Sequence, residues 1–575
     1  MLILGLHSGY HDACACVYDD YRLLAAVAQE RMTRRKNDGG GIPVEAMDEC
    51  LAIAGRSRAD VDAIALSHAA FPSRYFGHLS GGRAAERMVR QWLGKEKHKT
   101  MEREMARANV VDATQIFRAP QFLADNGFRA STQVHFYNHH LAHALPTLFH
   151  TDWQEALLYT ADGGGDNVQY SHRLFRDGHI ETLYGSRDEL LRPMRIDSLG
   201  RAYGFATQAL GWRSLRHEGK LTGLAAYGKP SLYEDMARHF RVDDAGQVHS
   251  DFADYNAMRE FIFGLAKNAT REDVAASVQE LLEQMVLRSI RTLLDRHPMR
   301  NLGLSGGVFA NVRLNRLLAE ALPVDEVFIY PSMGDQGLAC GGALDLLLAR
   351  DGMDVWLGRR ERLRRLYLGR DYDGDIDAAF DADPNISRIS SNPVETTASL
   401  LAEGKAVAIY ASGMEYGPRA LGARSIIGSP ADAGINDSLN KRLERSEFMP
   451  FAPVVAEEDA QGVFELTDGM LYAARFMTIT CGVNTVWRDR IPAVVHVDGT
   501  ARPQIISRED NPLYYDILAA FKRATGLPVM INTSFNVHEE PIINTPAERG
   551  RALKDGRIDC VVTTGGVYER TGGQP

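Results

Sequence analysis

The chain has few cysteines, no long apolar run and no excess of positive charge. Among its 575 residues there are six cysteines and no Cys-x-x-Cys pair, which argues against a disulfide framework or a cysteine zinc site. They are Cys14, Cys16, Cys50, Cys340, Cys481 and Cys560. We expect buried thiols in a reducing cytoplasm. No apolar stretch approaches the roughly 20 residues that cross a bilayer, and the N-terminus shows no export signal, so no membrane partner is expected.

The charge balance is acidic. The chain has 65 Lys and Arg against 75 Asp and Glu, a formal net charge of −10. This disfavours a broad electrostatic grip on nucleic acid but leaves room for a local basic cleft. The length exceeds that of an ordinary single domain, so we expect more than one domain. The oligomeric state stays open, with a homodimer as one option.

The N-terminal part shows one pattern of elements twice. Apolar strands separated by turns are predicted at 1–6, 13–18 and 23–28, and again at 156–161, 168–175 and 180–184. The two halves share pattern but negligible sequence identity. The pattern predicts an α/β domain in which the two halves face each other across a cleft, with a glycine turn on each wall.

Two further divisions follow from composition. Residues 71–121 are polar, charged and rich in helix formers. We expect them to form an insertion that covers the cleft or bears the site for an acceptor substrate. Breakers and acidic residues between Tyr367 and Asn392 indicate a domain boundary. Beyond it, a helix at 394–403 and a strand at 406–410 begin a second α/β unit.

A candidate metal site is the most informative feature. On a helix, His139 and His143 stand four positions apart and face the same way. Asp162 ends a predicted strand and is followed by Gly163 and Gly164, whose bare backbone suits a polyphosphate beside a cation. Two histidines at this spacing also arise by chance.

Two positions bear on what such a site does. Asp335 lies in the loop before a predicted helix at 338–346 and is either a fourth metal ligand or a helix cap. A zinc protease needs a Glu directly after its first motif histidine, and His140 stands there instead.

Arginines set among glycine and proline predict an anion site in the second unit. Arg419 and Arg424 stand five apart in one loop, and Arg445 and Arg502 follow. A stretch from Asn532 to Ser534 is predicted to follow a strand at 528–531 and offers amide and hydroxyl donors. The alternative is that each arginine is a solvated surface residue.

Two glycine turns complete the candidate set. Gly306 and Gly307 follow a predicted strand and precede a helix start near Asn311, so a nucleotide can approach the backbone there, although tight packing also explains a glycine pair. His11 and Asp12 lie in the first turn and fit a general base or an acceptor-binding pair; Asp12 as a simple turn cap is the alternative.

Together these residues resemble the NodU/CmcH family of O-carbamoyltransferases, which includes the tobramycin carbamoyltransferase. The resemblance covers nearly the whole chain. It rests on Asn-His-His-Leu-Ala-His-Ala at 138–144, Asp-Gly-Gly-Gly-Asp at 162–166, His-Glu-Gly-Lys at 217–220, Gly-Gly-Val-Phe-Ala-Asn at 306–311, Glu-Tyr-Gly-Pro-Arg-Ala-Leu-Gly-Ala-Arg-Ser at 415–425 and Phe-Met-Pro-Phe-Ala-Pro at 448–453. The segment 443–449 departs from the family pattern, which leaves open which cation contacts phosphate.

The resemblance implies a fold and a reaction. It implies an actin-like, Kae/TsaD-like domain over 1–370, built from duplicated RNase H-like halves, and a YrdC-like domain over 390–575. It further implies that the YrdC-like part makes carbamoyladenylate from carbamoyl phosphate and Mg-ATP. The Kae-like part, with Fe(II) or another divalent metal, then transfers the carbamoyl group to a hydroxyl of a small natural product.

The resemblance also assigns residues. His139, His143, Asp162 and Asp335 match the metal ligands. Arg419, Arg445, Arg502 and the stretch from Asn532 to Ser534 match contacts to ATP and carbamoyl phosphate. Asp12, Lys36 and Asn311 match positions near the intermediate and the acceptor.

Two other functions compete with this one. A tRNA-modifying enzyme of the threonylcarbamoyladenosine pathway contains both kinds of domain, but the acidic balance and the lack of a basic stripe argue against it. A nucleotide-gated binding protein or ATPase fits the N-terminal pattern and leaves the arginine-rich second unit without a role.

Overall fold

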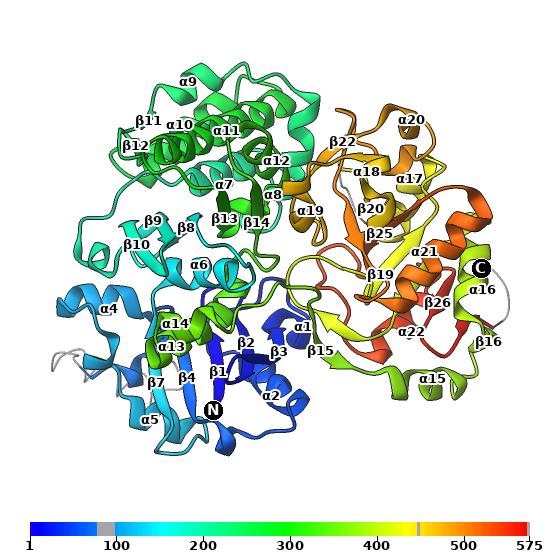
Figure 1. Cartoon of the computed structure of the whole chain (residues 1–575), viewed down its shortest axis with the longest axis horizontal. Coiled ribbons are helices and arrows are strands. Elements are labelled where there is room, and N and C mark those ends of the chain that lie inside the picture. Colours follow the sequence, from blue (N-terminus) through cyan, green and yellow to red (C-terminus); the bar gives the residue numbers. More distant parts are fainter. Residues whose placement is uncertain (78–97, 445–448, 572–575) are drawn as a thin grey trace.

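The computed structural model describes residues 1–77, 98–444 and 449–571. It has the predicted α/β architecture, with two five-stranded sheets in the N-terminal part and one eight-stranded sheet formed by residues between 386 and 570 (Figure 1). The first two sheets lie one above the other on the left of the figure, and the third lies on the right.

The two N-terminal sheets have the same strand order. The first is β3-β2-β1-β4-β7 and the second is β10-β9-β8-β13-β14. In each, the first three strands pair antiparallel and the last two join parallel. The strands are β1 (Leu2–His7), β2 (Cys14–Asp19), β3 (Arg22–Ala28), β4 (Ala63–Ser67), β7 (Gln133–Tyr137), β8 (Ala156–Gly165), β9 (Val168–Arg176), β10 (His179–Tyr184), β13 (Asn301–Ser305) and β14 (Glu326–Ile329). The predicted duplication is therefore confirmed.

Two helices lie between these sheets. α6 (His139–Phe149) packs on β8 and β13 of the second sheet, and α13 (Leu338–Asp351) packs on β1 and β4 of the first. The helices touch each other at Gly341, where a Cβ atom would lie 1.8 Å from the carbonyl oxygen of Ala142. Glycine is needed at this point because no side chain fits between the two backbones.

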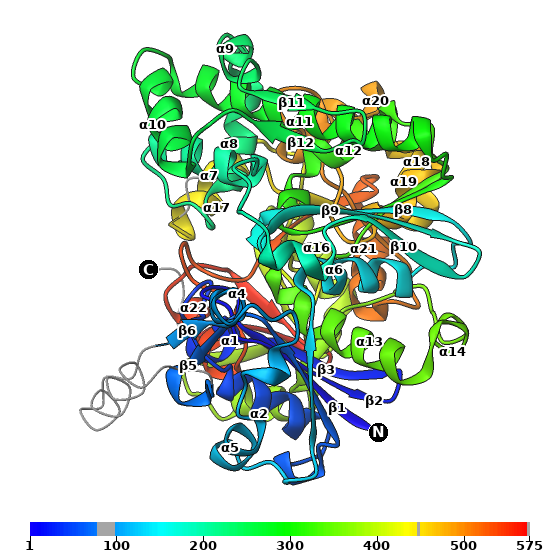
Figure 2. The same ribbon diagram turned by 90° about the vertical axis from the view of Figure 1, so that its left-hand side faces the viewer.

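Further helices surround the second sheet. In Figure 2 the helices α9, α10 and α11 lie at the top, well away from β1 and β2. Other helices of the N-terminal part are α1 (Gln29–Thr33), α4 (Met101–Ala108), α7 (Leu199–Ala209), α8 (Glu218–Leu224), α9 (Tyr233–Ala237), α10 (Tyr255–Ala266), α11 (Arg271–Arg296) and α12 (Val312–Ala321). Among these, α7 and α8 pack against the long helix α11.

The third sheet has the order β16-β27-β26-β17-β19-β25-β20-β24. Its strands are β16 (Ile386–Ser390), β27 (Val567–Arg570), β26 (Cys560–Val562), β17 (Val407–Tyr410), β19 (Arg424–Gly428), β25 (Val529–Ser534), β20 (Ala452–Ala456) and β24 (Gln504–Ile506). Helices α16 (Pro393–Ala402) and α21 (Pro512–Thr525) pack against each other beside it. The sheet starts at Ile386, and the boundary between Tyr367 and Asn392 stays a prediction.

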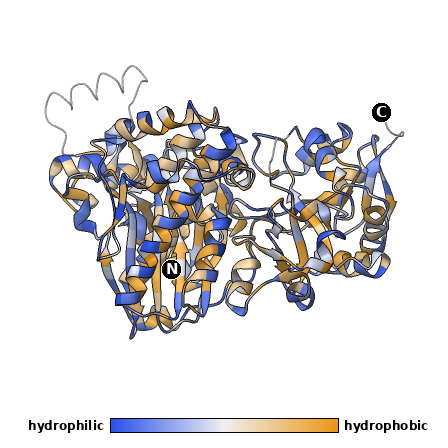
Figure 3. Ribbon diagram, turned by 90° about the horizontal axis from the view of Figure 1, so that it is seen from above, coloured by the Kyte–Doolittle hydropathy of each residue, from blue (hydrophilic) through white to orange (hydrophobic). Residues whose placement is uncertain are grey.

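The cores follow the strands. Figure 3 shows the strands of the sheets mostly in the hydrophobic colour and the outer helices and loops largely in the hydrophilic one. All six cysteines are buried and none forms a disulfide, as the sequence predicted. Within the described residues, no helix combines the length and the apolar character that crossing a bilayer requires.

Two predicted strand ends are wrong. β8 does not end before Asp162 but continues through the glycines to Gly165, and the chain reverses at Asp166 and Asn167. These two residues have φ values of 50° and 64°, as the tight turn of a hairpin requires. Likewise, β25 includes Asn532 to Ser534, because their backbones pair with β19.

Described residues at both ends of the expected insertion at 71–121 pack in the core, and the insertion itself stays a prediction. Residues 78–97 lie outside the described residues. On either side of them, Phe71, Tyr75, Met101 and Phe117 are buried in the core of the first half. These flanks belong to the core because their apolar side chains cover the first sheet.

Candidate functional site

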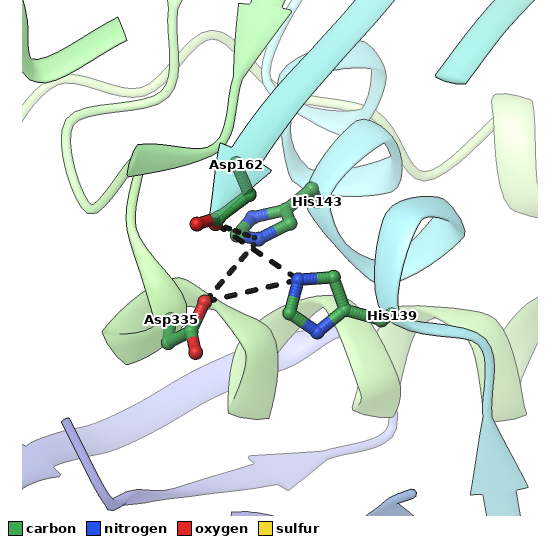
Figure 4. A group of neighbouring side chains, drawn as sticks. All are labelled: His139, His143, Asp162 and Asp335. Atoms are coloured by element: carbon green, nitrogen blue, oxygen red, sulfur yellow. Dashed lines mark ion pairs between the residues drawn. The ribbon is translucent and has the colours of Figure 1, made fainter. Parts of the chain in front are cut away.

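Four side chains meet between the two N-terminal sheets: His139, His143, Asp162 and Asp335 (Figure 4). His143 Nε2 lies 3.2 Å from Asp162 Oδ2 and 3.6 Å from Asp335 Oδ1. His139 Nε2 lies 3.9 Å and 3.8 Å from the same two atoms. The helix, the strand and the loop named by the sequence therefore bring all four predicted ligands to one place.

The N-terminus of α6 is fixed by Asp166. Its carboxylate accepts hydrogen bonds from the His139 backbone N–H and from Asn138 Nδ2, both at 2.7 Å. Its other oxygen lies 2.8 Å from Nδ1 of His68. Asp166 follows Asp162 in the same motif, yet sequence reasoning gave it no role of its own, because its contacts come from the residue after β4 and from the start of α6.

A missing side chain makes room for His139. A Cβ atom on Gly165 would lie 2.3 Å from Cγ of the His139 ring, so only glycine fits at this point of β8. The third glycine of the motif therefore determines where the imidazole lies.

The electrostatics of the cluster favour charged carboxylates. Burial and the charge of Asp335 oppose ionisation of Asp162, but the neighbouring His139 and His143 outweigh them and hold the pKa of Asp162 well below its usual range. Burial also opposes a charge on His139, yet Asp162 and Asp335 raise the pKa of His139 to about 9. Two ionised carboxylates between imidazoles form a preformed site for a cation.

The donor set fits a divalent metal. Nε2 of His139, Nε2 of His143 and Oδ1 of Asp335 are buried and have no hydrogen-bond partner among the described residues. A tetrahedral site with metal–ligand bonds of about 2.1 Å separates its ligand atoms by about 3.4 Å, close to the distances found here. Imidazole and carboxylate together suit Fe(II), Mn(II) or Zn(II) and do not discriminate among them.

A cavity of about 410 Å³ opens beside the cluster. Asp162 and Asp335 lie on its wall, and the predicted site residues His11, Asp12, Lys36, Gly163, Gly307, Asn311 and Arg419 line it too. His11 Nδ1 and Asp12 Oδ2 are 3.0 Å apart, and Asn37 Nδ2 donates to Asp12 Oδ1 at 2.9 Å. Residues from the predicted turns of both halves, His11 and Asp12 from the first and Gly163 from the second, therefore line one cavity.

A second cavity of about 280 Å³ adjoins the first. Arg502, Asn532 and Ser534 line it, together with three further basic residues that the sequence did not single out as anion contacts: Arg216, His217 and Lys220. Seven residues line both cavities: Lys36, Arg216, Gly219, Thr222, Ala310, Pro418 and Arg419. The cavities therefore share a wall that is rich in positive charge.

Besides His139 and His143, three of the predicted site residues that the structure describes line neither cavity. Arg424 is fully buried, and its guanidinium donates to the carbonyl oxygens of Ala411, Ser412, Ala423 and Arg370 while lying over the Tyr410 ring. It is therefore a structural residue, and the prediction that it binds phosphate is wrong.

The other two are glycines with packing roles. A Cβ on Gly306 would lie 2.1 Å from the carbonyl oxygen of Ala161, and one on Gly164 would lie 2.4 Å from Gln169 Oε1. Both have positive φ. Their predicted contact with a nucleotide stays a prediction. Arg445 lies outside the described residues.

The sequence missed residues that come from distant segments. Arg216 Nη1 donates to Glu539 Oε2 at 3.0 Å, and His217 Nε2 lies 2.5 Å from Glu539 Oε1. Burial opposes ionisation of Glu539, but His217 and Arg216 outweigh it and lower its pKa to about 2. The motif at 217–220 marked one side of this contact, and nothing in the sequence marked Glu539.

Comparison with known proteins identifies two matching family models. The model described as carbamoyltransferase N-terminus matches residues 2–344, and the one described as carbamoyltransferase C-terminus matches residues 398–570. Nodulation protein NolNO of Sinorhizobium fredii is 30% identical over 571 residues, covering 96% of this chain and 78% of that protein. Nodulation protein NolO of Bradyrhizobium diazoefficiens is 34% identical over 427 residues, 72% and 75% of the two chains.

Likeness to solved structures is weaker. The crystal structure of T. kodakarensis HypF aligns with a TM-score of 0.34 at 13% identity, over 61% of this chain and 48% of that one. This likeness is too low to bear on function.

Proposed function

The chain belongs to the carbamoyltransferase family, and from that premise we propose that it uses ATP to transfer a carbamoyl group to an alcohol in two steps, one in each cavity. The observation that carries the proposal is the shared wall. An arginine-lined cavity and a cavity beside a metal-type cluster meet at Lys36, Arg216 and Arg419. A reactive intermediate made in one cavity reaches the other without entering bulk water.

The second cavity suits the activation step. Carbamoyl phosphate, ATP and one water give carbamoyladenylate, phosphate and pyrophosphate, so the site must hold several phosphate groups at once. Arg419, Arg502 and Lys220 supply positive charge on its wall, while Asn532 and Ser534 supply polar groups. Fixed cations neutralise the charge that builds up as pyrophosphate leaves.

The first cavity suits the transfer step. An acceptor hydroxyl attacks the carbamoyl carbon and the bond to the AMP oxygen breaks, so the hydroxyl proton needs a base. Asp12 or His11 accepts it, since the two lie in contact on the wall of the cavity that Asp162 also lines. Fe(II) or another divalent cation held by His139, His143, Asp162 and Asp335 supplies Lewis-acid chemistry there.

The proposed acceptor is a small hydroxylated natural product, and no nucleic acid takes part. The net charge of −10 supports the second point, because a tRNA substrate requires a broad basic surface. Of the first cavity's wall, Leu215, Leu282, Val308 and Met333 are apolar, which suits an organic ligand more than a phosphate backbone.

The two half-reactions test the proposal separately. With His143→Ala or Asp162→Ala we expect loss of carbamoyl transfer, while pyrophosphate release that depends on carbamoyl phosphate persists. With Arg502→Ala we expect the release itself to fall. Mass spectrometry of candidate acceptors, for the gain of one carbamoyl group, reads the transfer step. Equal loss of both half-reactions in the His143 variant contradicts the division between cavities.

A further inference from the structure

His7 lies beside the metal-type cluster and has no role in the function proposed above. It ends β1 and is 2% exposed. Neither ring nitrogen has a hydrogen-bond partner among the described residues. A buried polar side chain without a partner costs free energy, so its presence calls for a physical reason.

The ring faces one oxygen of Asp335, Oδ2, which also lies 4.0 Å from His11 Nδ1. His7 Nε2 lies 3.5 Å from Asp335 Oδ2. His139 and His143 face the other oxygen, Oδ1, at 3.8 and 3.6 Å. The two oxygens of one carboxylate therefore have different neighbours.

The backbone around His7 is shaped to place the ring there. A Cβ atom on Gly9 would lie 2.3 Å from His7 Nε2, so the absence of a side chain at Gly9 leaves space for the imidazole. β1 is held on both edges, antiparallel to β2 and parallel to β4. A residue at the end of such a strand has little freedom to move away from Asp335.

We infer that His7 is a positioning residue for the metal centre: its Nε2–H donates to Asp335 Oδ2 and leaves Oδ1 as the ligand atom. The inference rests on the metal site of the proposed function. A separation of 3.5 Å exceeds the usual range of about 2.7–3.2 Å, so the ring and the carboxylate approach by a few tenths of an ångström. Such a donor fixes the orientation of a ligating carboxylate, and loss of a contact of this kind weakens metal affinity by about 10–100-fold.

Cobalt(II) binding to the full chain tests the inference without any assay of catalysis. The dissociation constant comes from competition with a chelator, and the visible spectrum of bound cobalt reports its coordination. We expect His7→Leu to raise the dissociation constant about 10–100-fold and to shift the spectrum. His7→Gln, whose amide nitrogen donates from about the same place, is expected to restore both.

A buried histidine elsewhere provides the control. His150 follows the other end of α6 and is 4% exposed, and His150→Leu is expected to leave cobalt affinity unchanged. If His7→Leu does not fold, His7→Asn replaces it, since its shorter amide does not reach Asp335 Oδ2.

Each outcome decides one question. Failure of the wild-type chain to bind cobalt overturns the proposed metal site itself. Wild-type binding with an unchanged affinity and spectrum in His7→Leu overturns the role of His7. Equal weakening in His7→Leu and His7→Gln also overturns it, because packing and not hydrogen bonding then accounts for the effect.

Discussion

Arg216 and Glu539 form an ion pair beside the shared wall of the two cavities, with 3.0 Å between Nη1 and Oε2. Arg216 precedes α8 in the N-terminal part, whereas Glu539 follows β25 in the C-terminal sheet. The second amino group of Arg216 donates to the carbonyl oxygen of Lys36 at 2.6 Å. The pair thus joins both parts of the chain beside the wall at which the proposed intermediate passes from the second cavity to the first.

We predict that Glu539→Gln lets more of the proposed intermediate escape before it reaches the first cavity. The amide keeps the shape but loses the charge that holds Arg216 and His217, an effect of up to about 1 kcal/mol because the side chain is one-third exposed. Pyrophosphate released per acceptor carbamoylated should rise up to about fivefold. The matched control is Glu540→Gln, at the exposed neighbouring position. An unchanged ratio in both variants contradicts a coupling role.

Gly165→Ala should weaken metal binding. The added Cβ would lie 2.3 Å from the His139 ring, so the imidazole must move away from the other three residues. We expect affinity for cobalt or iron to fall by about tenfold or more, measured by chelator competition. Gly163→Ala, two positions earlier in β8, has no atom within 4 Å of the new Cβ and should bind the metal as the wild type does.

Arg419→Ala should impair the activation step. Arg419 lines both cavities, and loss of one charge-assisted contact to phosphate costs about 1.5–3 kcal/mol, or roughly 10–100-fold in kcat/KM for pyrophosphate release. The control is Arg508→Ala, whose arginine is exposed and pairs with Asp516 on the surface. Comparable losses in the two variants would mean that general charge, and not position, matters.

His172→Phe should flatten the pH dependence of stability. His172 is fully buried against Tyr159 and Tyr170, and this burial, aided by Arg173, lowers its pKa to about 3. Below about pH 6.5, His172 is therefore protonated in the unfolded chain but stays neutral in the folded chain. The free energy of unfolding then falls by up to about 1.4 kcal/mol per pH unit from pH 6.5 toward pH 3.

Urea unfolding at several pH values between about 4.5 and 7 measures this slope. Phenylalanine fits the same aromatic stack and cannot be protonated, so the variant should lose less stability on acidification than the wild type. His179→Gln, at an exposed position of β10, should keep the wild-type slope. Identical slopes in all three proteins would show that other groups control acid sensitivity.

Local patterns predicted much of the fold because they depend on near neighbours. Alternating apolar runs located the strands of both N-terminal halves, and the helix beginning at His139 placed its two motif histidines on one face. The strand ends were less well predicted. Gly163 to Gly165 were expected to form a turn, yet Gly165 pairs with Val168 of β9, which extends the strand and moves the turn to Asp166 and Asn167.

Long-range packing decided what the local patterns left open. Arg419 and Arg424 looked equivalent in the sequence, but one lies on the shared cavity wall and the other is buried under backbone carbonyls. Glu539 and His7 carried no signal, because their partners lie 322 and 328 positions away. The sequence by itself determined which chemistry the chain contains, since residue types and short spacings are local properties. Only the tertiary structure decided which side chains meet, because burial and ion pairing depend on contacts between distant segments.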